Sequence, residues 1–283
     1  GNQQNYQLTF SGATDKTNYF VSGGYQKEEG IISPAWYDRL SFRTNLDTEI
    51  KSWLHLSSNL NVTRTKRRDA TDNTSSGRGG IILSVLNTPP FLEIWDPAHP
   101  GQYAVNPFQP SWENPVAQAS SYNMNNDYRL MGNVAITIDF TKELKFKSSF
   151  SADFTSHQWD SFIDPVKTGY GRQNNGLGEA ARDTYLTWLT EHLLTYDKSW
   201  GKHTVSVLAG MTAQEYHHEN SYQAVKDFVK GVQNNKEYMT LNWANQITAS
   251  TTSADEWALV SGLARFHYNW DSRYLATANL RVD

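Results

Sequence analysis

Histidine and acidic residues lie side by side at one place in the chain, in the composition that metal centres use. His217 and His218 stand between Glu215 and Glu219. A metal site needs several ligands that converge, but adjacent residues of an extended strand point to opposite faces. No third ligand follows at a suitable spacing, so we expect a polar rim here and no metal centre.

Two further pairs, Glu191 with His192 and Asp160 with Asp164, have the residue types of a general acid and base. Catalysis would also require a nucleophile or a converging set of polar groups, which the sequence around them does not supply. The glycine-rich stretch 76–80 lacks the Lys-Ser/Thr of a phosphate loop and is expected to open a short helix at 81–86. We predict a protein that is not an enzyme and uses no cofactor.

The dominant pattern is an alternation of apolar and polar residues. The clearest stretch, 128–140, has apolar side chains at one parity: Tyr128, Leu130, Val134, Ile136, Ile138 and Phe140. The stretch 144–155 repeats the scheme with Phe146, Phe150 and Phe154. Because side chains alternate faces along a strand, each stretch has one apolar and one polar face. Such a division suits a transmembrane β-barrel, with lipid outside and a polar lumen.

The same alternation predicts about ten strands. Their predicted ranges are 4–13, 18–27, 38–50, 53–65, 127–140, 144–156, 184–197, 203–216, 257–269 and 273–283. The seventh is the weakest, because Thr190 and His192 fall on its apolar parity.

The links between these strands alternate between short and long. The long links are predicted at 28–37, 66–126, 157–183 and 217–256. Bacterial barrels place short turns on the periplasmic side and long loops outside, so the pattern also predicts an orientation. Three long links exceed about 15 residues, which is unusual in a compact domain unless the loop is functional.

Composition agrees with this interpretation and excludes others. The chain has 38% hydrophobic residues and a mean hydropathy of −0.63, which is too polar for a bundle of membrane helices. Aromatic residues make up 13%, which suits interfacial girdles and sugar-stacking loops. A net charge of −4 argues against nucleic acid as a partner. The basic cluster Arg64, Lys66, Arg67 and Arg68 is expected to form a solvated rim.

The ends of the sequence lack the usual signals. A strand begins almost at Gly1 without a secretory signal, and the last strand stops on Asp283 without a terminal aromatic residue. We expect a segment of a longer chain.

Several stretches resemble one family. The sequence "NYQLTFSGATDKTNYFVSGGYQKEEGII" (5–32) with "YDRLSFRTNLD" (37–47) is similar to the early barrel strands of SusC/RagA-type TonB-dependent outer-membrane transporters. "LLTYDKSWGKHTVSVLAG" (193–210) and "ARFHYNWDSRYLATANLRVD" (264–283) also resemble them. The resemblance implies a transmembrane antiparallel barrel of 22 strands, of which 1–283 would be a partial barrel domain without its plug.

The resemblance also implies a function. Such proteins import large nutrients across the Gram-negative outer membrane, usually oligosaccharides and in some members oligopeptides. They are energised by TonB through an amino-terminal region and are capped by a SusD-like surface lipoprotein. The partners it implies are therefore this lipoprotein, the TonB complex, outer-membrane lipid and a glycan or peptide cargo.

We expect ligand contact in the long link 66–126, which is rich in proline and aromatic residues. Its candidate side chains for cargo or lid contact are Phe91, Trp95, Tyr103, Phe108 and Trp112. They have three possible roles: the small core of the loop itself, contact with the lid, or stacking on cargo.

Two alternatives belong to other classes. A passive porin would share the alternation, but it would need neither plug nor lid, and it would leak current in bilayers. A soluble β-rich glycan-binding protein would share the aromatic content, but it would not need an unbroken apolar face and would dissolve without detergent.

Overall fold

The computed structural model describes residues 1–70, 80–110, 112–229 and 240–283. Ten strands dominate it: β1 (Gln3–Ala13), β2 (Thr17–Glu29), β3 (Trp36–Lys51), β4 (Leu54–Arg68), β5 (Tyr122–Asp139), β6 (Leu144–Ile163), β7 (Leu177–Trp200), β8 (His203–Phe228), β9 (Ala244–Trp270) and β10 (Tyr274–Val282). The short helices are α1 (Ile81–Asn87), α2 (Pro115–Ser120), α3 (Gly169–Asn174) and the 3-10 turn η2 (Leu241–Trp243). Among the described residues, no helix has the length and apolar composition needed to cross a bilayer.

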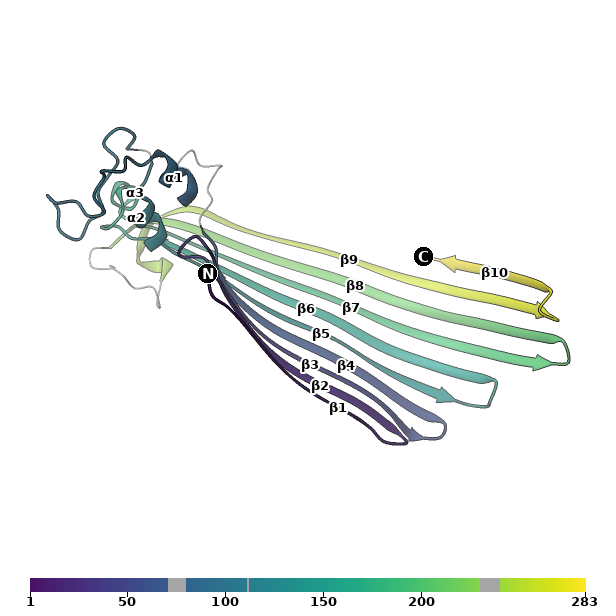
Figure 1. Ribbon diagram of the computed structural model, residues 1–283. Coiled ribbons are helices and arrows are strands. Elements are labelled where there is room, and N and C mark those ends of the chain that lie inside the picture. The colour runs from purple at the N-terminus through teal and green to yellow at the C-terminus, as the bar shows by residue number, and fades with distance from the viewer. Residues whose placement is uncertain (71–79, 111, 230–239) are drawn as a thin grey trace.

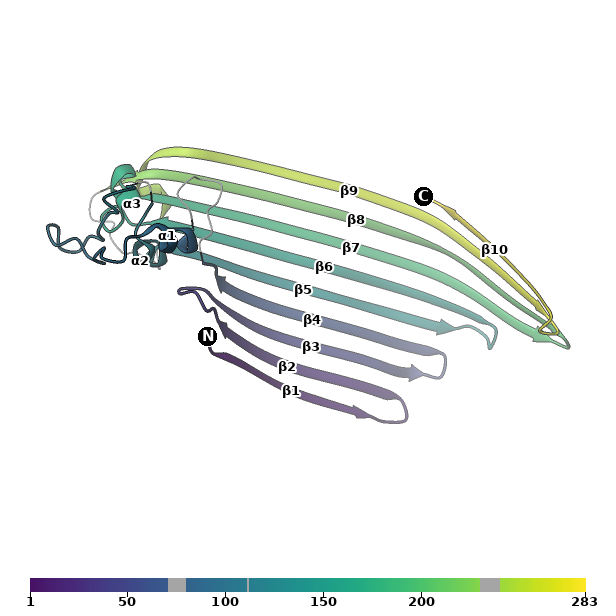
Figure 2. The ribbon, with the colours of Figure 1, turned by 45° about the horizontal axis from the view of Figure 1, so that its top comes forward.

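Each strand pairs antiparallel with its neighbours in the sequence, so the sheet order is β1 to β10 without a crossover. The sheet is open and curved, with the helices gathered at one end and the short turns at the other (Figures 1 and 2). This meander is the topology of a barrel wall, and the predicted all-β antiparallel class and the number of strands are confirmed.

The register joins the apolar positions of neighbouring strands into one face, hereafter the outward face. Val62 pairs with Leu130, Leu130 with Phe154, and Phe154 with Leu186. These side chains stay exposed, as do Leu8, Phe42, Val134, Ile136, Phe150 and Leu280. Buried residues lie instead on the opposite, polar face, where curvature shields Ser22, Ala135, Ser149 and Ser261.

Strand β7 carries the polar residues that weakened its prediction, and both do lie on the outward face. The Thr190 hydroxyl donates to the Ser149 carbonyl at 3.0 Å, and the Ser148 Oγ lies 3.0 Å from His192 Nδ1. Polar groups in an apolar medium are costly unless they are hydrogen-bonded. These side chains bond to the wall itself, which explains how β7 tolerates them.

The strand ends at the long-link side were predicted wrongly. Strands β6 to β9 continue further than expected, so the predicted loops 157–183 and 217–256 shorten to 164–176 and 229–243. A bilayer needs only about ten residues of a tilted strand, whereas β9 has 27. The additional strand residues lie beyond the apolar band, where the apolar and polar alternation used for the prediction does not continue.

A small apolar core closes this end of the sheet. Phe162 and Phe228 meet edge to face with ring centroids 5.2 Å apart, and Val225 packs beside them. Gly176 has a φ of +86°, and a side chain there would press on Phe228. The core ties the ends of β6 and β8 to the link between β6 and β7.

A charge introduced on the outward face should destabilise the protein more than the same charge introduced on the polar face. Val134→Lys should lower the free energy of unfolding in lipid vesicles by about 2–4 kcal/mol, because Val134 lies on the outward face near the middle of the apolar band. Equilibrium denaturant titration of the reconstituted full-length protein measures this loss.

The neighbouring residue provides the control. Asn133→Lys places the same charge on the polar face and removes two hydrogen bonds of the Asn133 amide, to the Ser151 hydroxyl at 2.8 Å and a longer one to the Phe150 carbonyl at 3.4 Å. Its cost should be about 1 kcal/mol. Equal losses in the two variants would refute the assignment of faces.

Candidate functional site

The link 69–121 between β4 and β5 folds over the end of the sheet and carries the predicted aromatic site residues. Four of the five form two pairs. Phe91 and Phe108 meet edge to face at 6.2 Å, and Trp95 stacks on Tyr103 with ring centroids 4.4 Å apart. Trp112 is half-buried, and its amide donates to the Gln109 carbonyl at 2.9 Å. We name the described part of this link the loop platform.

Trp95 and Tyr103 also pair through their backbones, as an isolated antiparallel bridge. The turn between them is fixed by Asp96, whose carboxylate accepts from the Ala98 amide at 2.8 Å and lies 2.9 Å from His99 Nδ1. The hydrogen bond with His99, helped by that amide, lowers the pKa of Asp96. Asp96 therefore stays ionised and continues to hold the turn in mildly acidic conditions.

Two buried asparagines hold the loop platform together. Asn106 donates to the Asn87 carbonyl at 3.0 Å and accepts from the Phe108 amide at 3.0 Å. Asn114 donates to the carbonyls of Ile94 and Ala104 at 3.3 and 3.2 Å. Each amide side chain replaces backbone partners that the irregular chain leaves unpaired, so the platform has a defined shape without a large apolar core.

Asn114 also begins α2, because its side chain accepts from the Val116 amide at 2.9 Å. The proline at the first helical position is preorganised for that conformation. The next contact reaches another link: the Glu113 carboxylate accepts from the amides of Gly169 and Tyr170 at 3.1 and 2.8 Å. The platform is thereby bound to the start of α3.

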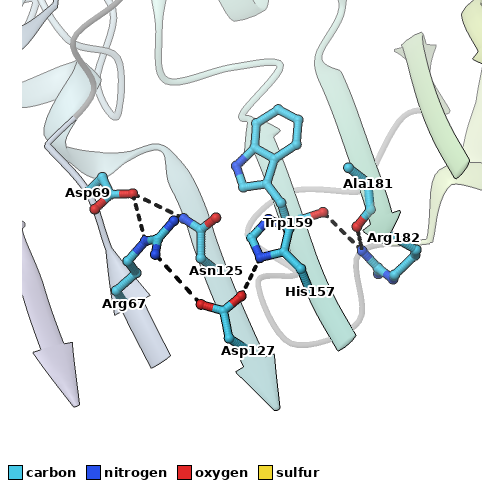
Figure 3. A network of polar contacts seen from close by, with 8 residues as sticks. All are labelled: Arg67, Asp69, Asn125, Asp127, His157, Trp159, Ala181 and Arg182. Atoms are coloured by element: carbon cyan, nitrogen blue, oxygen red, sulfur yellow. Dashed lines mark hydrogen bonds and ion pairs between the residues drawn. The ribbon is translucent and has the colours of Figure 1, made fainter. Parts of the chain in front are cut away.

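The stem of the platform is a polar network on β4, β5 and β6 (Figure 3). Asp69 receives hydrogen bonds from Arg67 and Asn125 at 3.3 and 3.2 Å. Asp127 lies 3.6 Å from Arg67 and also bonds to His157. The network joins the residues on either side of the link, so the platform leaves the sheet at a fixed position.

The packing of the platform leaves part of its apolar surface uncovered. Phe91 and Phe108 are each 71% exposed and Trp95 is 52% exposed, whereas Tyr103 is buried. Other exposed apolar side chains of the platform are Ile82, Val85, Leu86, Ile94 and Val116. Of the predicted set, Tyr103 thus has a packing role, while Phe91, Trp95 and Phe108 remain available to a ligand or partner.

The sequence prediction missed a second group of aromatic and acidic side chains, on the polar face of β6 to β9. We name it the wall panel. Tyr185 stacks on His218 at 4.2 Å, and Tyr216 stacks on Trp257 at 5.8 Å. Its polar residues are Asp183, Glu179, Asn220, Tyr222, Asp255 and Trp159, with Asn220 donating to Asp183 at 2.8 Å and Tyr222 to Glu179 at 2.7 Å.

The wall panel was overlooked because most of it lies in stretches predicted to be loops. A period of two does continue there: Tyr216, His218, Asn220 and Tyr222 share one parity on β8. The signal was present as aromatic and polar residues at every second position, without the apolar alternation that marks lipid contact.

Three cations on the polar face of the sheet have partners in the wall itself. Arg129 pairs with Asp153 at 2.6 Å, and Lys145 lies 3.5 Å from Asp139. Arg265 donates to the Asn279 side chain at 2.9 Å.

The residue pairs considered for catalysis do not assemble. Glu191 and His192 lie on opposite faces of β7, since their partners on β6 are Ser149 and Ser148. Asp160 pairs with Arg182 at 2.6 Å, while Asp164 accepts from backbone amides in the next turn. Within the described ranges no group of three or more candidate ligands has the geometry of a metal site.

Comparison with known proteins gives a consistent result. The chain is 28% identical over its full length to the TonB-dependent receptor P3 of Formosa agariphila. It is 23% identical over 98% of its length to the TonB-dependent receptor SusC of Bacteroides thetaiotaomicron. The predicted resemblance to SusC/RagA-type TonB-dependent transporters is therefore confirmed. No family profile matches the chain.

The same fold occurs in a solved SusC/RagA-type structure. The RagAB peptide transporter superposes with a TM-score of 0.77 at 22% identity, over 99% of this chain and 31% of the solved chain. The chain spans 28% of the length of each of the two curated relatives. Their names are those of receptors and transporters, which agrees with the expectation of a protein that is not an enzyme.

The platform gives a prediction about Asn114. Asn114→Ala would leave the buried Ala104 carbonyl without its side-chain donor and the Ile94 carbonyl with only the Ala104 amide, at a cost of about 1–3 kcal/mol. Backbone amides within 94–104 should then exchange hydrogen about tenfold faster or more, measured by mass spectrometry on the full-length protein.

Asn87→Ala is the matched control, because that side chain is exposed and bonds only within α1, to the Leu83 carbonyl. Its exchange rates should be unchanged outside α1. An unaltered rate in Asn114→Ala would show that the buried asparagine does not hold the platform.

Proposed function

We propose that the chain forms part of the wall of a TonB-dependent importer of large nutrients, oligosaccharides above all, in the Gram-negative outer membrane. The observation that supports this most is the apolar outward face on a ten-strand meander, together with curated relatives named TonB-dependent receptors. In this proposal the loop platform lies outside the cell and the short turns lie on the periplasmic side.

The loop platform is proposed to meet a SusD-like surface lipoprotein. Its exposed aromatic and aliphatic side chains lie at the end of the barrel wall, where a lid would close. Large exposed apolar side chains on a backbone that hydrogen bonds keep in place are typical of protein interfaces. Energy from TonB would enter through a region of the protein outside these residues.

A cargo of oligosaccharides is supported by the wall panel. Sugar rings present apolar C–H faces and many hydroxyls, which aromatic rings and carboxylate or amide groups bind respectively. Tyr185, Trp257 and Asp255 offer these groups on the polar face, and Asp255 and Trp257 are exposed.

Oligopeptides are the second candidate. The solved structure described above is that of a peptide transporter and matches almost the whole chain. Carboxylates of the wall panel, such as Asp183 and Asp255, would then pair with basic side chains or the amino terminus of a peptide.

A double variant tests the role of the platform. Phe91→Ala with Phe108→Ala should reduce uptake of a fluorescent oligosaccharide pool by about tenfold, since aromatic anchors of an interface commonly contribute more than 1 kcal/mol each. It should also reduce the amount of lipoprotein that copurifies with the importer in detergent.

Ile31→Ala is the control, because Ile31 is 94% exposed in the link between β2 and β3 but lies outside the platform. Uptake that persists in cells lacking TonB would indicate a passive porin and contradict the proposal. Uptake of a labelled peptide pool but of no oligosaccharide would establish the second candidate.

A further inference from the structure

Cations line the edge of the apolar outward face on β2 to β4. Along β4, the outward position after Val62 is Arg64, and the next is Lys66. Lys27 on β2 lies in the same row as Lys66, because Lys27 and Lys66 both pair with Asp38 on β3. In the orientation proposed above, this edge is level with the headgroups of the outer leaflet.

These cations differ from three cations on the polar face of the same sheet. Arg67, Arg129 and Lys145 each lie within ion-pair distance of a carboxylate. Among the described residues, Arg64 and Lys66 have no such carboxylate. Asp38 stands between Lys27 and Lys66 in the same row, but among the described residues it lies within ion-pair distance of neither lysine.

The arrangement around Arg64 supports an anionic ligand. Its guanidinium lies over the Tyr128 ring, 5.7 Å from the centroid, and its Nε has no hydrogen-bond partner. Stacking on Tyr128 orients the guanidinium, and the Nε that has no partner is buried. The nearby acid Asp38 accepts from the Tyr25 hydroxyl at 2.9 Å, and Lys27 has only an exposed contact of 3.7 Å with Glu29.

From this geometry we propose that Arg64, Lys66 and Lys27 bind the phosphate of an anionic lipid. Arg and Lys donors are the usual partners of phosphate, and each basic residue near a charged membrane surface adds to the binding. Phe42, Val62 and Leu130 lie side by side in the adjacent outward row. A lipid places its phosphate against the cations and its acyl chains along this row, whereas free phosphate would reach only the cations.

This proposal rests on the outer-membrane location proposed above, and its test does not depend on import. The full-length protein is purified in detergent and titrated with dioleoyl phosphatidylglycerol, dioleoyl phosphatidylcholine or inorganic phosphate, and native mass spectrometry counts the retained adducts. The unmodified protein should retain phosphatidylglycerol selectively. Each of Arg64→Gln, Lys66→Gln and Lys27→Gln should weaken that binding about fivefold, and the triple variant about a hundredfold.

Lys198→Gln is the matched control, since it removes one outward lysine at the opposite end of the sheet. It should leave phosphatidylglycerol binding unchanged. Equal retention by the triple variant and the unmodified protein would overturn the proposal. Binding of inorganic phosphate as tight as that of the lipid would also overturn it, because the acyl chains would then contribute nothing. A protein that binds the lipid but imports nothing would refute the proposed function alone.

Discussion

The pairing of every strand with its sequence neighbour is the constraint on which the other features depend. Hydrocarbon offers no hydrogen bonds to the backbone, so a chain that crosses it must satisfy its amides and carbonyls within a helix or a sheet. Ten strands paired in order do so between neighbours, from β1 to β10, along the described sheet. Since the register is fixed, a shift of one residue on any strand would move its apolar side chains to the polar face. The alternation in the sequence and the order of the strands in the sheet therefore both follow from the need to cross a hydrocarbon layer.

The same constraint explains which parts of the fold were predictable. The middle of each strand was found because lipid demands an apolar residue at every second position, as in Leu130, Val134 and Ile136. Strand β9 shows where that information stops. From Ala244 to Glu256 most residues on both faces are polar, and the stretch is a strand because β8 pairs with it, with Asn220 opposite Ser253. That pairing is a tertiary property, so local alternation does not reveal it.

The candidate site was predictable only in part for a similar reason. Aromatic residues in the link 69–121 were identifiable by composition, but their division into packed and exposed members was not. Tyr103 is buried because its amide donates to the Lys167 carbonyl, a residue of another link. The wall panel is formed by four strands, β6 to β9, and the ends of these strands near the long links show no alternation of apolar and polar residues. Contacts between segments that are distant in the sequence therefore determine the arrangement of the residues in both groups.

The loop platform keeps large apolar side chains exposed, although burial in a core would be more favourable for them. Exposed residues such as Phe91 and Phe108 would lower their free energy by collapsing into a core, and a flexible loop of this length would allow it. Buried polar side chains prevent the collapse here. Asn106, Asn114 and Glu113 bond mainly to backbone groups, so rearranging the loop would leave those groups unpaired at about 1–3 kcal/mol each. The polar bonds inside the platform thus keep the apolar residues on its surface, where a partner can reach them.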